Sequence, residues 1–194
     1  MADLLSSMDG TSATAIRGLL TVCFPDARTT LDTTYGNGNF WGEAQPTIGG
    51  DILPARARDC VLDYRRLPFR DQSVDVVIFD PPFQPATTRQ QAGKTERRFM
   101  HGARGIGAVK ADVELGCVEA FRVGRLGCIV KVQDYIHSHR PIWMTKWVWD
   151  VLGEPYDFLT LRVPSKLRAS NWKEQRSVWR NHSTFWVFRH RSIR

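Results

Sequence analysis

The chain has 194 residues and a mass of 22.2 kDa, which favours one domain that can bury a core without disulfides or metals. Ordinary hydrophobic and charged fractions (42% and 24%) argue against a disordered or fibrous chain, and no apolar run reaches the roughly 18 residues of a membrane helix. Lys and Arg outnumber acids 27 to 20, giving a net charge of +7, and such a surface attracts phosphate-bearing partners or acidic membranes.

In chain order, short β-rich apolar runs alternate with helical stretches, which predicts an α/β fold with a mostly parallel sheet. The run at 74–80 is almost continuously apolar, as expected of a strand covered on both faces. Residues 84–110 are polar and basic, and a long segment of this kind within a compact domain is usually functional. We expect helices at 12–20, 113–123 and 139–152, and strands at 28–32, 47–51, 60–63, 74–80, 127–132, 157–163 and 184–189.

The four cysteines, Cys23, Cys60, Cys117 and Cys128, show no Cys-x-x-Cys spacing. Residues 1–10 lack the basic start and apolar stretch of a secretory signal, so we expect a soluble cytoplasmic protein whose thiols stay reduced. Cys60 and Cys128 lie in apolar runs and are expected in the core. We expect no metal site, because no His or Cys cluster completes one.

Acidic residues follow three consecutive predicted strands. Asp32 opens the loop at 32–38 (Asp-Thr-Thr-Tyr-Gly-Asn-Gly), and Asp51 and Asp63 end the next two strands. Glycines let a nucleotide-like ligand approach the backbone, and an acid about 20 residues beyond such a loop suits ribose hydroxyls. Any one of these acids could merely cap a loop, but together they define one edge of a sheet, where α/β proteins bind ligands.

The next predicted strand, at 74–80, ends in Asp80, and Pro81, Pro82 and Phe83 follow it directly. Two prolines fix an extended backbone and remove two donors, which leaves carbonyl groups free to accept hydrogen bonds. A carboxylate beside such a carbonyl can hold both hydrogens of a planar amino group, and an aromatic ring can stack on the base that carries it. Alternatively, the two prolines could merely stiffen the chain where it leaves the strand. The acids at the ends of the three preceding strands disfavour this interpretation.

These motifs resemble class I S-adenosylmethionine-dependent methyltransferases of the group that methylates amino groups of nucleic-acid bases. The loop at 32–38, the glycine loop, resembles that group's cofactor loop. Residues 80–83 resemble its catalytic tetrad, with Phe in place of the commoner Tyr. Together with residues 124–134 and 180–188, they resemble small DNA-methylase-like proteins of phages and actinobacteria. The resemblance implies cofactor-binding roles for Asp32, Thr34, Tyr35, Gly36, Gly38, Asp51, Ile52, Asp63, Tyr64 and Asp80, and catalytic roles for Asp80, Pro81, Pro82 and Phe83.

The implied fold is one three-layer α/β/α Rossmann-like methyltransferase domain spanning residues 1–194. Its seven-stranded sheet would have the order 3-2-1-4-5-7-6, with the last strand antiparallel. Residues 39–46 and 52–59 are too short for full crossover helices. The only candidate for target recognition after the tetrad is the short insert at 84–110.

The implied reaction is methyl transfer from S-adenosylmethionine to adenine N6 in DNA, because Asp at the head of the tetrad usually accompanies adenine. The alternatives are an RNA (rRNA or tRNA) base amino-methyltransferase, a cytosine N4 DNA methyltransferase, and a non-catalytic nucleic-acid-binding relative. The expected partner is nucleic acid, and a homodimer or a partner that supplies specificity stays open. Beside such a tetrad, phosphate and base contacts are expected from Arg89, Lys94, Arg97, Arg98, Arg104, Trp172, Lys173, Arg176 and Arg180.

Overall fold

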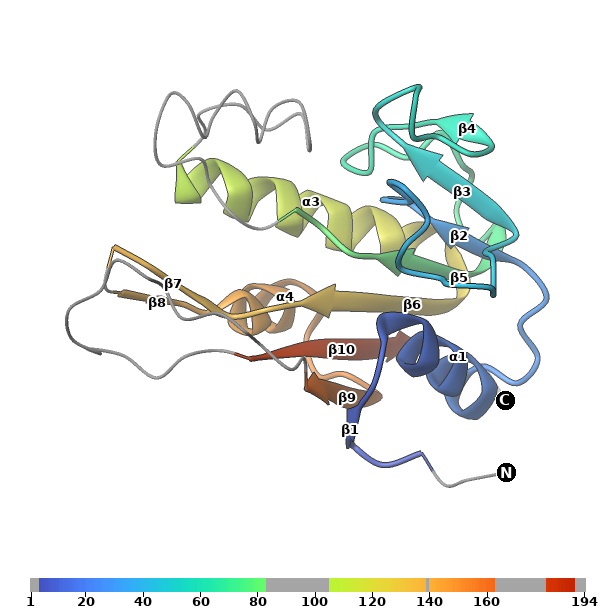
Figure 1. Ribbon diagram of the computed structural model, residues 1–194. Helices are drawn as coiled ribbons and strands as arrows, with labels where there is room; N and C mark the ends of the chain where they lie inside the picture. Colours follow the sequence, from blue (N-terminus) through green and yellow to red (C-terminus); the bar gives the residue numbers. More distant parts are fainter. Residues whose placement is uncertain (1–3, 83–104, 139, 163–180, 191–194) are drawn as a thin grey trace.

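The computed structural model describes residues 4–82, 105–138, 140–162 and 181–190. Its centre is an eight-stranded mixed sheet, in which β5 and β6 lie in the middle and β1 and β4 form the two edges (Figure 1). In sheet order the strands are β1 (Ser7–Asp9), β9 (Asp157–Arg162), β10 (His182–Arg189), β6 (Gly124–Val132), β5 (Val74–Phe79), β2 (Thr30–Asp32), β3 (Ile48–Asp51) and β4 (Cys60–Val61).

The strand directions confirm the expected topology. β10 runs antiparallel to both neighbours, β6 and β9, and the other paired strands of this sheet are parallel. From β4 to β9, the order β4-β3-β2-β5-β6-β10-β9 is the expected 3-2-1-4-5-7-6. The expected number of seven strands is wrong, because β1 adds an eighth beside β9. This strand has three residues and no apolar alternation, and it exists through its backbone pairing with β9.

Helices cover both faces of the sheet, so the fold has three layers. All six residues of β5 are buried, and from Val76 to Phe79 their side chains alternate between two cores. Val77 and Phe79 belong to the core under α3 (Ile106–Val123) and α4 (Met144–Leu152), whereas Val76 and Ile78 belong to the core under α1 (Ser12–Cys23). This alternation is the period of two that a strand buried on both faces requires.

Loops replace two of the crossover helices, as expected from their length. Within the described residues, no helix lies between β2 and β3 or between β3 and β4. Trp41, from the first of these connections, is only 2% exposed and joins the core under α1. A buried indole therefore covers part of the sheet face that a longer chain would cover with a helix.

The helix boundaries differ from the expected ones. α1 begins at a capping box between Thr11 and Thr14 and continues to Cys23, three residues beyond its expected end. α3 begins at Ile106 rather than at Val113, so the end of the insert expected at 84–110 is helical. The rest of that insert, up to residue 104, lies outside the described residues.

The helix expected at 139–152 is wrong in its first part. A hairpin of β7 (Tyr135–His137) and β8 (Arg140–Ile142) precedes α4, which begins only at Met144. Pro141 accounts for part of the difference, because the residue before a proline disfavours the helical conformation and proline is accepted in a short edge strand. The buried face of α4 is formed by Met144 and Val148 rather than by Trp143, which is 48% exposed.

Three properties of the described residues bear on the class of protein. The four cysteines are free; Cys128 is fully buried, as expected, whereas Cys60 is only partly buried and packs against the core. No described helix is long and apolar enough to cross a membrane. Among the described residues, no group of three or more His, Cys, Asp or Glu side chains could hold a metal ion.

Candidate active site

The carboxyl ends of three neighbouring strands bring the predicted acids to one edge of the sheet. β3, β2 and β5 pair in parallel, so residues that follow their last positions lie side by side. Asp32 ends β2, Asp51 ends β3, and Asp80 directly follows β5. Figure 1 shows these strands as neighbours next to β6.

Asp32 organises the loop from inside. Its side chain is 1% exposed and accepts hydrogen bonds from Trp41 Nε1 at 2.6 Å, from the Thr34 amide at 2.8 Å and from Thr34 Oγ1 at 3.3 Å. Burial raises the pKa of Asp32 to about 6, although these hydrogen bonds oppose the shift, and the nearby charge of Asp80 adds to it. Because Thr34 and Trp41 cover Asp32, this carboxyl supports the glycine loop rather than facing solvent.

The glycine loop is tied to β3 through the Asp51 side chain. The Gly36 amide donates to Asp51 Oδ2 at 3.0 Å, and the Leu53 amide donates to Asp51 Oδ1 at 2.8 Å. Gly36 and Gly38 have φ angles of +60° and +72°, in the left-handed region that favours glycine. Each Asp51 oxygen therefore accepts one of these bonds, and a carboxylate has further lone pairs for hydroxyl donors.

The Tyr35 side chain packs inside this loop. Its hydroxyl donates to Gln45 Oε1 at 2.7 Å, and the Arg58 guanidinium lies 5.6 Å from the ring centroid. A Cβ at Gly38 would come within 2.7 Å of the Tyr35 hydroxyl, and one at Gly49 within 2.8 Å of the ring. Tyr35 therefore fixes the shape of the loop, and Ile52, the other expected contact residue there, is partly exposed.

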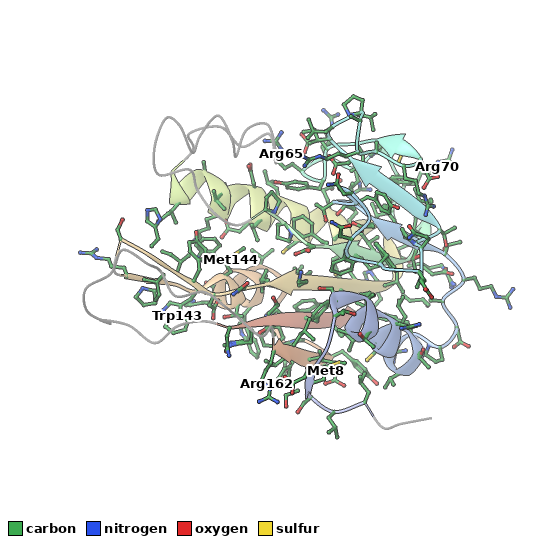
Figure 2. The ribbon with its side chains drawn as sticks, in the orientation of Figure 1. Met8, Arg65, Arg70, Trp143, Met144 and Arg162 are labelled. Carbon is green, nitrogen blue, oxygen red and sulfur yellow. The ribbon has the colours of Figure 1, made fainter. Side chains whose placement is uncertain are left out.

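Asp63 has a partner that the sequence analysis did not anticipate. Arg65 Nη2 lies 2.6 Å from Asp63 Oδ2 and Arg65 Nε lies 2.9 Å from Oδ1, so the guanidinium holds both carboxylate oxygens. Arg65 also reaches Asp112 of α3 at 3.5 Å and lies between α3 and the β3–β4 region (Figure 2). An adenine amino group would have to share Asp63 with Arg65. Tyr64 is 6% exposed, and its ring packs 5.1 Å from that of Phe79.

Asp80 is joined to the glycine loop on one side and to β6 on the other. Its amide donates to Thr34 Oγ1 at 3.1 Å, and Thr34 in turn donates to Asp32. Its Oδ2 accepts from Lys131 Nζ at 2.9 Å. No hydrogen-bond partner occupies Asp80 Oδ1 within the part of the chain that the structure describes. One connected network therefore runs Trp41–Asp32–Thr34–Asp80–Lys131.

Trp41 and Lys131 are the two members of this network that the sequence analysis missed. Lys131 is the one charged residue in the run Gly-Cys-Ile-Val-Lys-Val at 127–132, and a charge within a buried strand requires a partner. That pattern could have drawn attention to Lys131. Trp41 has no comparable signal, because a tryptophan after a glycine loop is equally compatible with simple packing.

The remaining predicted residues fall into two groups. Pro81 is buried and Pro82 is partly exposed, directly after Asp80. Phe83 lies outside the described residues, and so do all the predicted nucleic-acid contacts: Arg89, Lys94, Arg97, Arg98, Arg104, Trp172, Lys173, Arg176 and Arg180.

Comparison with solved structures identifies the fold. The chain is similar to an S-adenosylmethionine-dependent methyltransferase of Thermotoga maritima, described as a possible histamine N-methyltransferase, with 14% identity and a TM-score of 0.50 over 93% of this chain and 88% of that one. It is also similar to protein 1320 of Thermoplasma acidophilum, with 14% identity and a TM-score of 0.49 over 94% and 89% of the two chains. No family model and no curated protein sequence matches the chain. The fold is that of class I S-adenosylmethionine-dependent methyltransferases.

Proposed function

We propose that this protein transfers a methyl group from S-adenosylmethionine to the exocyclic amino group of a nucleic-acid base, adenine N6 in DNA. One observation carries the proposal: in a methyltransferase fold, Asp80 follows the central strand β5, is tied to the glycine loop through Thr34, and keeps Oδ1 without a partner among the described residues. An acceptor in this position suits an amino group brought beside the cofactor loop.

S-adenosylmethionine is the expected cofactor, and the described residues fit it in part. Asp51 would hold the ribose hydroxyls through its remaining lone pairs, and the backbone at Gly36 and Gly38 would border the methionine part. Asp63 would meet the adenine only by sharing its oxygens with Arg65. The bound cofactor would supply a methyl group on a sulfonium sulfur.

Asp80 would act on the amino group that receives the methyl. The amino nitrogen would use its lone pair for the new bond to the methyl carbon as the sulfur–carbon bond breaks and its electron pair stays on sulfur. The nitrogen would gain positive charge and then pass one of its two protons to Asp80 Oδ1, and from there to solvent. A carboxylate oxygen that accepts an N–H bond favours this developing charge over the neutral bound base, and so stabilises the transition state more than the substrate. Pro81 and Pro82 lack amide hydrogens, so no backbone donor from them competes for that oxygen.

The Asp80–Lys131 pair favours a neutral amino group over a cationic aliphatic amine. The charge of Asp80 is already paired with an ammonium 2.9 Å away, and a cationic substrate would have to compete with Lys131 for it. A neutral base needs only a free acceptor oxygen. The net charge of +7 adds general attraction to a phosphate backbone.

The test is methyl transfer from labelled S-adenosylmethionine to a mixture of DNA and RNA, followed by nucleoside analysis, with Asp80→Ala as the matched control. We expect label in N6-methyldeoxyadenosine with the wild type alone. Label in N4-methyldeoxycytidine or in an RNA nucleoside would overturn the adenine-in-DNA assignment while supporting amino methylation. Transfer no greater than in Asp80→Ala would overturn the proposed function and favour a binding protein.

A further inference from the structure

Lys131 occupies an unusual place for an ammonium group. It lies on β6 between the buried Val130 and Val132, and its side chain is 18% exposed. Removing an ammonium from water is costly, and the pattern of the strand would equally admit an apolar residue. The structure therefore places a cation where packing alone does not require one.

Three contacts hold the Lys131 ammonium in one position. Nζ lies 2.9 Å from Asp80 Oδ2, 5.1 Å from the centroid of the Phe40 ring and 6.0 Å from that of Phe185. Phe185 lies directly opposite Lys131 in the β10–β6 pairing, and Phe40 comes from the connection after the glycine loop. Aromatic faces attract cations, so the rings and the carboxylate together restrict the Lys131 side chain.

We propose that Lys131 is a positioning residue for methyl transfer, which holds Asp80 by Oδ2 so that Oδ1 is presented to the target amino group. The inference rests on the proposed function. A carboxylate held by one oxygen loses its freedom to rotate about Cβ–Cγ, and misplacement of a reacting group by about 1 Å can cost on the order of 100-fold in rate.

The same ammonium lowers the negative potential of the site. Asp32 and Asp80 are two carboxylates joined through Thr34, and the charge of Asp80 contributes, after burial, to the raised pKa of Asp32. Within the described residues, Lys131 is the cation that hydrogen-bonds to this pair. Removing Lys131 should therefore raise the pKa of Asp32 further, and removing the charge of Asp80 should lower it.

The first measurement is the single-turnover rate of methyl transfer to DNA by Lys131→Met, with Lys131→Arg as the conservative variant. Lys146→Met serves as the matched control, because Lys146 is also paired with an aspartate, Asp150, but lies on the exposed part of α4. We expect Lys131→Met to slow transfer by about tenfold or more and Lys131→Arg to recover part of the rate. The Kd for S-adenosylmethionine should stay within about twofold, and Lys146→Met should match the wild type.

The second measurement is independent of activity: the titration of the Asp32 carboxyl carbon by NMR. We expect the midpoint of Asp32 to rise in Lys131→Met and to fall in Asp80→Asn. A purely structural role of Lys131 would leave this midpoint unchanged. If Lys131→Met does not fold, Lys131→Gln, which keeps a polar head without charge, takes its place in both measurements.

The outcomes separate this inference from the proposed function. A wild type that transfers no methyl group overturns the proposed function. An active wild type with an equally active Lys131→Met overturns the positioning role, whatever happens to Asp32. A slow Lys131→Met whose rate Lys131→Arg does not recover in part overturns it as well, because the loss of rate would then come from general damage to the site.

Discussion

The two ends of β5 carry aspartates with opposite surroundings. At the amino end, Asp75 is 8% exposed; its Oδ2 accepts from the Arg28 amide at 2.8 Å and the Thr29 amide at 3.0 Å, and its Oδ1 accepts from Arg125 at 2.6 Å. At the carboxyl end, Asp80 accepts from Lys131 with one oxygen, and the other has no partner among the described residues.

This difference separates a carboxylate that supports the fold from one that can act on a ligand. Burial alone would raise the pKa of Asp75, but the two amides and Arg125 outweigh burial and lower the pKa to about 2. Arg125 Nε also donates to Asp75 Oδ1 at 2.9 Å, so each oxygen of Asp75 accepts two bonds and has no lone pair left for a substrate. Asp80 keeps acceptor capacity at the edge where the glycine loop lies, which is where α/β folds bind ligands.

The largest expected effect is on catalysis at the Asp80 end. Asp80→Ala should slow single-turnover methyl transfer by about 100-fold or more, the scale for removing one preorganised electrostatic partner. Affinity for S-adenosylmethionine, measured by calorimetry, should change much less, because Asp51 and the glycine loop remain. Asp80→Asn should keep part of the rate, since its amide oxygen is still an acceptor. Equal rates for Asp80→Ala and the wild type would remove Asp80 from the catalytic site.

At the Asp75 end the expected effect is on stability. Asp75→Ala leaves two backbone amides and Arg125 without their acceptor, which should lower the free energy of unfolding by about 2–4 kcal/mol at neutral pH. Because the pKa of Asp75 is lowered in the fold, its stabilisation is present above the ordinary value of 3.8 and is lost as the pH falls toward about 2. Urea unfolding should therefore show the gap between variant and wild type shrinking in acid. A gap that is constant with pH would contradict the assigned ion pair.

Asp32 should show the opposite slope. Its pKa is raised from 3.8 to about 6, so its favourable contribution is complete below 3.8 and is lost as the pH rises through about 6. The stability of the wild type relative to Asp32→Asn should thus fall by about 3 kcal/mol between pH 4 and 7. Unfolding midpoints of both proteins across this range measure the change, and a difference that rises with pH would contradict the burial of an ionised Asp32.

The smallest expected effect concerns cofactor affinity. Asp51→Ala should weaken binding of S-adenosylmethionine by about 1.5–3 kcal/mol, the scale for losing a charged acceptor. Part of this loss would come from the loop, because Asp51 also holds the Gly36 amide. Calorimetry with Gln45→Ala as a control, which loosens Tyr35 without touching an acid, separates the two causes. Unchanged affinity in Asp51→Ala would exclude this residue from the cofactor site.

The residues alone were sufficient to predict the acids at the edge of the sheet, and the resemblance that the motifs carry was sufficient to predict the strand order. Acids that directly follow apolar runs reveal their place in a parallel sheet, because each run ends where its strand ends. The Arg65–Asp63 and Lys131–Asp80 pairs could not be read in this way. The second joins residues 51 positions apart, and such partners depend on side-chain directions in the folded chain.

The errors have physical causes as well. β1 is the short segment Ser-Met-Asp with one apolar residue, too little for a strand signal in the sequence, and its pairing with β9 makes it a strand. At 139–152, Trp143, Trp147 and Val151 recur at intervals of four, which is typical of a helix, but Pro141 favours an extended backbone at the residue before it. The sequence does not mark the first turns of α3 as helical, because Gly105 and Gly107 weaken the helical pattern there.

The division of roles along β5 is tested most directly by Asp75→Ala and Asp80→Ala, measured side by side for the free energy of unfolding and the single-turnover rate of methyl transfer. We predict that Asp75→Ala loses stability and keeps its rate while folded, and that Asp80→Ala loses its rate while folded, whatever stability it loses with the Lys131 ion pair. A rate in Asp80→Ala equal to that of the wild type, or an equal loss of rate in both variants, would contradict it.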